Sequence, residues 1–453
     1  MSSMQFIVSA VAMRIMIVTD QYPPMVGGVP TVTYNLGIDL ANRGHQVSVI
    51  APSYSSRELS RIEQKVHVYR FSSFEWPTYK ELRIPFLPLL PLRNLIKKID
   101  PDIIHIHSPV VLGSIAHIHA GGLGKPVIAT NHYLPINMSR SLASEPLIGK
   151  HFCNMSYSYL VYFCNSCQYV TAPTMTALNL LYEHGLHAPA RAISNGIDLQ
   201  KFTPGERDPQ LLQRFGLPTD RPLLLHVNRL SEEKRVDVLL DAVAKMKTKA
   251  HLALVSTGPA EADLRLQVKR LAIDDRVSFL GFVSDGDLLV LRRSADLFVI
   301  PSEADLQSLS TMEAMACGLC IIAANAYALP ELVHHEENGL LFQPGDSNEL
   351  AQKIDYLLTD GERRARMAEQ SLKIIAAHDR IKVLDEWEEV YHRLAIEFKE
   401  NRGRPKYLRP VRKYQSYKPQ KASKVSKTKV AKLAKTQRMH RRSHNKFIFP
   451  PHH

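Results

Sequence analysis

The sequence predicts an α/β protein with two doubly wound domains, each with a parallel sheet between layers of helices. Short, continuous apolar runs recur along the chain, and such runs are typical of parallel strands buried on both faces. Most runs are followed by a loop and an amphipathic segment, which is the strand–helix–strand order of crossover connections. Because ligands bind outside the carboxyl ends of such strands, we expect two sheets that face each other across a cleft.

The first series of runs occupies residues 13–204. It opens on Arg14-Ile-Met-Ile-Val-Thr-Asp20, followed by a loop rich in proline and glycine at 21–30 and an expected helix over 31–43. Further strands of this domain are expected at residues 46–51, 102–107, 126–130 and 169–172.

The second series occupies residues 205–380. Its strands are expected at residues 222–227, 252–256, 277–280, 297–300, 320–323 and 339–342. The pattern predicts helix from 361 to 399, and we expect a C-terminal helix over 381–400 to pack back on the first domain. Residues 1–12 are interpreted as a leader before the first strand.

The charge of the chain changes near residue 400. The whole sequence has 57 Lys and Arg against 44 Asp and Glu, a formal charge of +13. Residues 401–453 carry 17 of these basic residues and no acidic residue, so residues 1–400 have a net charge of −4. The body therefore offers no general basic surface for nucleic acid, and the basic tail at 401–453 is expected to be disordered.

Composition and cysteine spacing exclude several classes of protein. With 45% hydrophobic and 22% charged residues, the body is typical of a soluble globular protein. No apolar run approaches the ~20 residues of a membrane-spanning helix, and the run at 6–13 lacks the positive segment of a secretory signal. The pairs Cys164/Cys167 and Cys317/Cys320 lie far apart in the chain, so we expect buried, reduced thiols rather than one zinc site.

The segment 301–318 carries the most informative pattern. A strand ends at Pro301, a short polar loop follows, and a helix begins near Ser308, where its positive dipole end favours an anion such as phosphate. Asp305 lies in the loop, and Glu313 lies inside an otherwise apolar helix where a carboxylate needs a partner. Ligand hydroxyls are one such partner; a helix cap and an internal ion pair are the structural alternative.

A second pattern follows the first strand of the second domain. Arg229 and Lys234 lie in the loop at its carboxyl end. Two cations that reach a diphosphate stabilise the charge of a leaving group and need no metal. Basic residues at an exposed helix start are the alternative interpretation.

Together these segments resemble the retaining glycosyltransferases of family 4, whose two Rossmann-like domains form the architecture called GT-B. The resemblance covers residues 13–400. It rests on the motifs Gly27-Gly28-Val29, Arg43-Gly44-His45, Asn195-Gly196-Ile197-Asp198, Asn228-Arg229-Leu230 with Lys234, and Glu313-Ala-Met-Ala-Cys-Gly318. The family's Glu-x7-Glu motif reads Asp305-x7-Glu313 in this chain, so one carboxylate is kept on a side chain shorter by a methylene.

The resemblance implies a role for each position. It places Glu313 on the ribose hydroxyls of a nucleotide sugar, Asp305 on the hexose, and His132 beside that hexose. The residues that it implies for the diphosphate are Gly27, Gly28, Arg229, Lys234, Leu306, Gln307, Ser308 and Leu309. It places Phe282 and Val283 near the base.

The implied reaction is transfer of a hexose with retention at the anomeric carbon. The acceptor hydroxyl attacks on the face that the phosphate leaves, and the phosphate takes up the proton, so the carboxylates position groups rather than act as a glycosidase pair. Uridine diphosphate glucose is the favoured donor. No metal and no other cofactor is expected.

Three further patterns are interpreted as structural. The Asp-x-Asp pairs Asp100/Asp102 and Asp285/Asp287 match a metal-binding motif of another glycosyltransferase fold, but the first precedes a strand and the second is expected to cap a helix that begins at Leu288. His105 and His107 lie on one expected strand, and we expect them to point to opposite faces and to share no metal. No Gly-x-Gly-x-x-Gly follows the first strand, which disfavours a dinucleotide oxidoreductase.

Two features bear on the acceptor. The segment 85–98 combines apolar residues with Arg93, Lys97 and Lys98, a composition suited to an anionic bilayer surface; a loop and an internal helix are the alternative. The tail at 401–453 suits the same surface. The segments Asn131-His-Tyr-Leu-Pro135 and Asp305-Leu-Gln307 also resemble family 4 enzymes that glycosylate diacylglycerol, although Ser308 replaces their usual glycine.

The sequence therefore predicts a lipid acceptor such as diacylglycerol and a peripheral position on the cytoplasmic face of the cell membrane. The alternatives are a phosphatidylinositol-type mannosyltransferase with a guanosine donor, a family 4 transferase with a soluble acceptor, and a nucleotide-sugar epimerase. Binding of nucleic acid through the tail, in which Tyr407, Tyr414 and Tyr417 lie among the lysines and arginines, is the less favoured interpretation.

Overall fold

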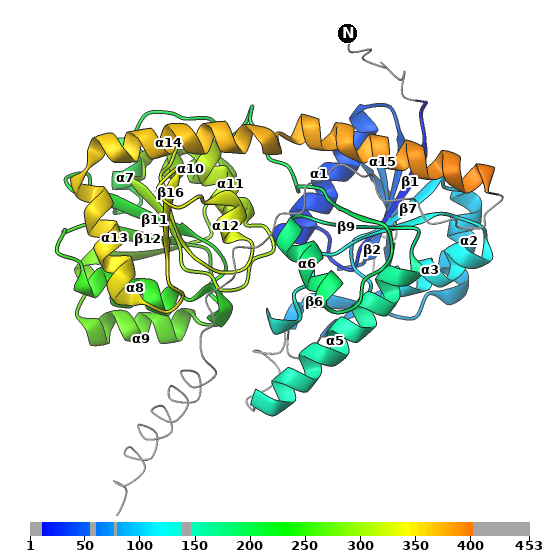
Figure 1. Ribbon diagram of the computed structural model, residues 1–453, viewed down its shortest axis with the longest axis horizontal. Coiled ribbons are helices and arrows are strands. Elements are labelled where there is room, and N and C mark those ends of the chain that lie inside the picture. Colours follow the sequence, from blue (N-terminus) through cyan, green and yellow to red (C-terminus); the bar gives the residue numbers. More distant parts are fainter. Residues whose placement is uncertain (1–10, 55–59, 77–78, 138–145, 402–453) are drawn as a thin grey trace, which may run out of the picture. The chain divides into compact units, whose positions relative to one another are not determined.

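The structure is a computed structural model that describes residues 11–54, 60–76, 79–137 and 146–401. The basic tail and most of the proposed leader lie outside the described residues. The described part contains two large sheets with helices on both faces (Figure 1), which confirms the predicted α/β class. No helix of this part is long and apolar enough to cross a membrane.

The first sheet has eight strands in the order β10-β9-β8-β7-β1-β2-β4-β3. Their bounds are β1 Arg14–Val18, β2 Gln46–Pro52, β3 Ser60–Glu63, β4 Val66–Phe71, β7 Ile103–Ile106, β8 Val127–Thr130, β9 Tyr169–Ala172 and β10 Ala190–Ala192. All pairings are parallel except that of β3 with β4. A separate antiparallel hairpin is formed by β5 (Ser73–Trp76) and β6 (Tyr79–Pro85).

Each face of the first sheet is covered by its own helices, because successive residues of a strand point to opposite faces. Ile15 and Ile17 of β1 pack with α1 (Gly28–Asn42) and α15 (Arg380–Glu400). Met16 and Val18 belong to the core of the other face. The helices of that face are α2 (Leu89–Ile99), α3 (Val111–Gly122), α5 (Pro146–Ser166) and α6 (Met175–Glu183).

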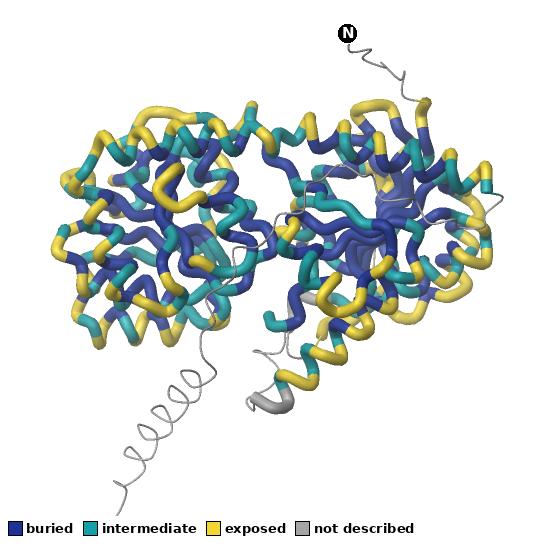
Figure 2. The backbone as a smooth tube through the Cα atoms, viewed as in Figure 1, coloured by how far each residue is buried: buried dark blue, intermediate teal, exposed yellow. Residues whose placement is uncertain are grey.

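The second sheet has six parallel strands in the order β13-β12-β11-β14-β15-β16. They are β11 Leu223–Val227, β12 His251–Val255, β13 Val277–Gly281, β14 Leu297–Ile300, β15 Ile321–Ala324 and β16 Gly339–Phe342. The surrounding helices are α7 Pro209–Arg214, α8 Val236–Lys245, α9 Glu261–Leu271, α10 Asp285–Ser294, α11 Leu309–Ala316, α12 Leu329–Leu332, α13 Ser347–Thr359 and α14 Gly361–Ile375. The central strands of both sheets are buried, and most exposed residues lie on the helices and loops around them (Figure 2).

The chain crosses between the two sheets at two neighbouring places. Ile197, in the connection after β10, pairs with Asp379 just before α15. Helix α15 then buries Trp387, Val390, Tyr391 and Leu394 in the core beside β1 and α1. The last described helix therefore completes the hydrophobic core of the first sheet.

Candidate functional site

The candidate site is a cleft lined by loops that follow strands of both sheets. It offers about 400 Å³ to water. The predicted site residues that line it are Gly27, Gly28, His132, Arg229, Lys234, Phe282, Asp305, Leu306, Gln307 and Leu309. Because these residues follow β1, β8, β11, β13 and β14, the cleft lies where a doubly wound sheet binds its ligands.

Two helix N-termini open on this cleft. Helix α1 begins at Gly28, and α11 begins at Leu309, where the Ser308 hydroxyl caps the helix by accepting a hydrogen bond from the amide of Thr311. A Cβ added to Gly28 would lie 4.0 Å from the side chain of Leu309. The amides of both helix starts therefore converge on one region, which favours an anion there.

Lys234 and Asp305 form an ion pair on the wall of the cleft. The Lys234 Nζ donates to Oδ1 of Asp305 over 2.8 Å, and each side chain is 12% exposed. The other oxygen, Oδ2, is buried without a hydrogen-bond partner among the described residues. His226 lies nearby, and burial lowers the pKa of its imidazole to about 4. A ligand with donors for Asp305 would satisfy a carboxylate that the protein satisfies only in part.

Gly258 brings the loop after β12 against the loop of Arg229. A Cβ at Gly258 would lie 2.2 Å from the carbonyl oxygen of Leu230, so a larger side chain would push the two loops apart. Both loops line the cleft. Sequence reasoning missed Gly258, because its role depends on a contact between loops that follow different strands.

Glu313 is bonded to another protein side chain. Its carboxylate accepts a hydrogen bond from Arg292 of α10, whose side chain is 3% exposed. Burial raises the pKa of Glu313, and Arg292 opposes that shift. Glu313 is not among the residues that line the cleft, so in this structure it takes the alternative stated above, an internal ion pair. Its contact with ribose stays a prediction.

The remaining predicted residues divide by exposure. Phe282 is 69% exposed and lines the cleft, so its ring is open to a ligand. Val283 packs against the core of the second sheet, and Ser308 is buried as the cap of α11. Neither of these two lines the cleft.

Three histidines gather beside the cleft, contrary to the prediction that two of them point apart. The rings of His105 and His107 have centroids 3.9 Å apart. The prediction was wrong because side chains two positions apart on a strand point to the same face, and His107 directly follows the last residue of β7, Ile106. The Nδ1 atom of His107 lies 3.0 Å from Nε2 of His132.

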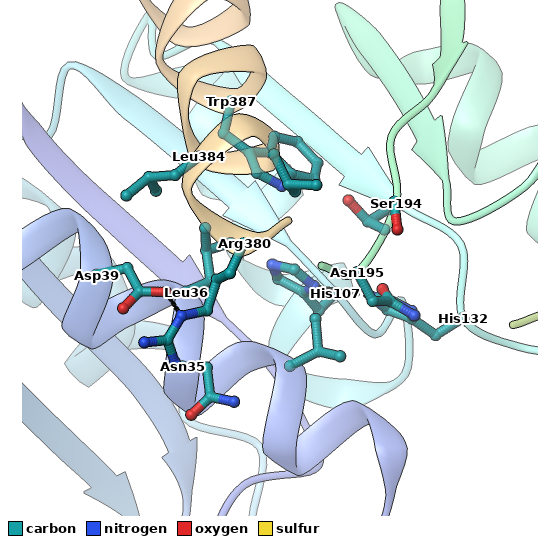
Figure 3. A pocket seen from close by; sticks show the side chains of 13 residues that line it. Asn35, Leu36, Asp39, His107, His132, Ser194, Asn195, Arg380, Leu384 and Trp387 are labelled. Atoms are coloured by element: carbon teal, nitrogen blue, oxygen red, sulfur yellow. Dashed lines mark hydrogen bonds and ion pairs between the residues drawn. The ribbon is translucent and has the colours of Figure 1, made fainter. Parts of the chain in front are cut away.

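His132 also lines a second, smaller cavity (Figure 3). It offers about 20 Å³ to water, enough for one molecule. Its lining is contributed by α1, by the strand ends that carry His107 and His132, by Ser194 and Asn195, and by α15. Here Arg380 of α15 forms ion pairs with Asp39 over 3.2 Å and with Asp198 over 3.1 Å.

The Asp-x-Asp pairs have protein partners. Asp100 binds Arg14 and Lys125, and Asp102 accepts the amide of Arg14. Helix α10 begins at Asp285 rather than Leu288, and Ser284 caps it by accepting the amide of Asp287. Within the described residues, no group of three or more His, Cys, Asp or Glu side chains could hold a metal ion. Burial raises the pKa of the Cys164, Cys167, Cys317 and Cys320 thiols.

Comparison with known families agrees with this architecture. The family model described as Glycosyltransferase Family 4 matches residues 26–201, and the model described as Glycosyl transferases group 1 matches residues 208–373. The chain is a family 4 glycosyltransferase. The glycosyltransferase is similar to solved structures over most of its length, which confirms the GT-B fold. They include sucrose-phosphate synthase from Thermosynechococcus elongatus (20% identity, TM-score 0.71, 84% of this chain and 99% of that chain) and Anabaena Alr3699/HepE with UDP and glucose (24%, 0.68, 83% and 99%).

Curated relatives of the glycosyltransferase have different substrates in their names. N-acetyl-alpha-D-glucosaminyl L-malate synthase from Bacillus anthracis is 28% identical over 82% of this chain and 94% of its own length. Alpha-monoglucosyldiacylglycerol synthase from Streptococcus pneumoniae is 27% identical over 81% and 83%. A GDP-mannose-dependent alpha-mannosyltransferase from Corynebacterium glutamicum is 28% identical over 78% and 83%. Because the chain belongs to a glycosyltransferase family, the alternative interpretation as a nucleotide-sugar epimerase is rejected.

Proposed function

We propose that this glycosyltransferase moves a hexose, with retention, from a nucleotide sugar to a membrane lipid, with uridine diphosphate glucose and diacylglycerol as the favoured pair. The observation that supports a nucleotide-sugar donor is that two helix N-termini, Lys234 and Arg229 lie in one cleft. This arrangement suits a diphosphate, which carries negative charge along its whole length.

The proposed reaction uses the diphosphate as its own base. The acceptor oxygen bonds to the anomeric carbon on the face from which the phosphate oxygen departs, and the departing phosphate takes the acceptor's proton. The products are a glycoside and a nucleoside diphosphate. Lys234, Arg229 and the amides of α1 and α11 stabilise the charge that develops on the leaving group, which is why we propose that no metal is required.

A surface of the first domain supports the lipid acceptor. We define the apolar patch as Phe74, Phe86, Leu87, Leu89 and Leu90. These side chains are 44–73% exposed, and the rings of Phe74 and Phe86 lie 5.5 Å apart.

The apolar patch adjoins helix α2, which anchors it. Leu92 and Ile96 are fully buried in the core, whereas Lys97 and Lys98, in the last turn of the helix, are exposed. Apolar side chains with neighbouring cations suit insertion into an anionic bilayer. We accordingly place the enzyme on the cytoplasmic face of the cell membrane. The relative that glucosylates diacylglycerol, by its name, supports the same acceptor.

The proposal is tested with the full chain and a panel of substrates. Purified protein is incubated with uridine diphosphate glucose, uridine diphosphate N-acetylglucosamine or guanosine diphosphate mannose, and with anionic vesicles that contain or lack diacylglycerol. Mass spectrometry identifies the product, and NMR identifies its anomer. We expect an α-glucosyl lipid that is absent with Glu313→Ala.

Three outcomes would contradict this proposal. A product formed only with a soluble acceptor such as malate would show that the acceptor is not a lipid. A product formed only with a guanosine donor would show that uridine diphosphate glucose is not the donor. A β-linked product would exclude retention.

The patch is tested separately by vesicle sedimentation. Leu87→Ser with Leu90→Ser should weaken binding to anionic vesicles, whereas Leu266→Ser, an equally exposed leucine on α9, should not. Deletion of residues 402–453 should also weaken binding. Equal binding by all variants would remove both surfaces from the proposal.

A further inference from the structure

The hydrogen bond between His107 and His132 uses one ring nitrogen of each residue. It joins Nδ1 of His107 to Nε2 of His132 over 3.0 Å, and the two rings are nearly parallel, with 9° between their planes. His107 is 2% exposed. The other nitrogen of His132, Nδ1, makes no hydrogen bond within the described residues and is not among their buried unpaired atoms, so a ligand or water can reach it, and His132 lines both the cleft and the smaller cavity.

One proton is shared along this bond, and its position decides what His132 offers to a ligand. If His132 donates, its Nδ1 is an acceptor and the proton of His107 lies on Nε2. That atom is buried with no partner among the described residues, and a buried N–H without a partner is rare in proteins. If His107 donates, its buried Nε2 carries a lone pair and no proton, so no N–H is left without a partner. The proton of His132 then lies on Nδ1.

A network of hydrogen bonds holds the neighbouring ring in place. His105 contacts the hydroxyl of Tyr391 through Nδ1 over 2.7 Å and that of Thr130 through Nε2 over 2.6 Å. Thr130 in turn contacts Thr171 over 2.6 Å. Because His105 is fully buried and its ring packs on His107, His107 has little freedom to turn its Nδ1 away from His132.

We propose that His107 is a positioning residue that keeps His132 neutral with its proton on Nδ1, so that an N–H donor faces the sugar end of the nucleotide sugar. This inference rests on the proposed function for the identity of the ligand. The hydrogen-bond arrangement itself does not depend on it. An N–H fixed in place before the substrate arrives costs no reorganisation when it binds a sugar oxygen.

The charge state of the group supports this placement. Burial lowers the pKa of His132 to about 4 and lowers the pKa of His107 well below its ordinary value. Both imidazoles are therefore neutral at pH 7, and each carries a single ring proton.

The tautomer is measured by NMR on the full chain labelled with ¹⁵N-histidine. Long-range ¹H–¹⁵N spectra distinguish a protonated Nδ1 from a protonated Nε2, and the His132→Asn spectrum assigns the signals. We expect His132 at pH 7 to carry its proton on Nδ1 alone in the wild type. In His107→Leu we expect a mixture of the two tautomers. A protonated Nε2 at His132 in the wild type would overturn the proposal. The proton of His107 would then lie on its own Nε2 and would need an acceptor such as a water in the small cavity. This readout does not require activity.

Kinetics with uridine diphosphate glucose give the second readout. His107→Leu should lower kcat roughly 10–100-fold, the range seen when the hydrogen-bond partner that orients a metal-binding histidine is removed, with a smaller change in the KM for the donor. His107→Asn, whose amide can donate from a similar position, should recover most of kcat.

His117→Leu is the matched control, since His117 is a half-buried, hydrogen-bonded histidine of the same domain that lines neither cavity. It should leave kcat near the wild-type value. Equal losses of kcat in His107→Asn and His107→Leu would mean that His107 only fills space, and would overturn the proposal.

Discussion

The cleft has two walls, one formed by loops of the first sheet and one by loops of the second, and the two walls present different polar groups. The second sheet contributes the cations Lys234 and Arg229 and the carboxylate of Asp305. The first sheet contributes the amides at Gly27 and Gly28 and the neutral imidazole of His132. The difference suggests a division of labour, in which formal charges bind the diphosphate and neutral, fixed dipoles meet the sugar.

The largest test of this comparison removes a charge from the second wall. Lys234→Met should lower kcat/KM for uridine diphosphate glucose by roughly 10²–10³-fold, the size seen when one group that stabilises a developing negative charge is lost. Steady-state assays of donor turnover measure it. Lys353→Met removes the same charge from an ion pair with Glu349 on α13, so it should have almost no effect. Comparable losses in both variants would mean that Lys234 acts through general charge alone.

Acid pH tests the neutral wall. Burial lowers the pKa values of His105, His107 and His132, whereas histidines of the unfolded chain take up protons near pH 6.5. Below pH 6.5 the unfolded state therefore binds more protons, and the free energy of unfolding should fall as the pH drops toward 4. Each such histidine contributes about 1.4 kcal/mol per pH unit.

Urea denaturation at pH 7, 6 and 5 measures this slope. His107→Asn should reduce this slope by the contribution of one histidine, about 1.4 kcal/mol per pH unit. His187→Asn, at an exposed position, should leave it unchanged. A slope that is the same in all three proteins would show that His107 is protonated equally in the folded and unfolded states.

The smallest expected effect concerns the length of one side chain. Asp305→Glu restores the carboxylate spacing of the family and keeps a partner for Lys234, so donor turnover should stay within a few-fold of the wild type. Asp305→Asn keeps the size but removes the charge, and it should be the more damaging change because it leaves Lys234 without its ion pair. The reverse order of the two variants would mean that side-chain length matters more than charge at this position.

The sequence predicted the buried parallel strands well, because a strand covered on both faces leaves a continuous apolar run. All six strands of the second sheet lie within one or two residues of their expected bounds. It did not predict β3 to β6 or β10. Strands β3 and β10 are the edges of the first sheet, β5 and β6 form a separate hairpin, and β4 alternates buried with more exposed residues, so their signal is weaker.

The candidate site was predictable to the extent that it depends on strand ends. Arg229, Lys234 and Asp305 meet because parallel strands place their following loops at one edge. The ion pair of Glu313 with Arg292 and the bond of His107 to His132 join residues 21 and 25 positions apart. Their geometry depends on how helices and loops pack, and no local spacing encodes it.

The position of α15 has a consequence for synthesis of the protein. The first sheet buries Ile15 and Ile17 against Trp387 and Tyr391, so the amino-terminal domain lacks part of its cover until almost 400 residues have left the ribosome. Domains usually fold in the order in which they are made. Here the domain made first is completed last, and the second domain can fold while the first still exposes an apolar face.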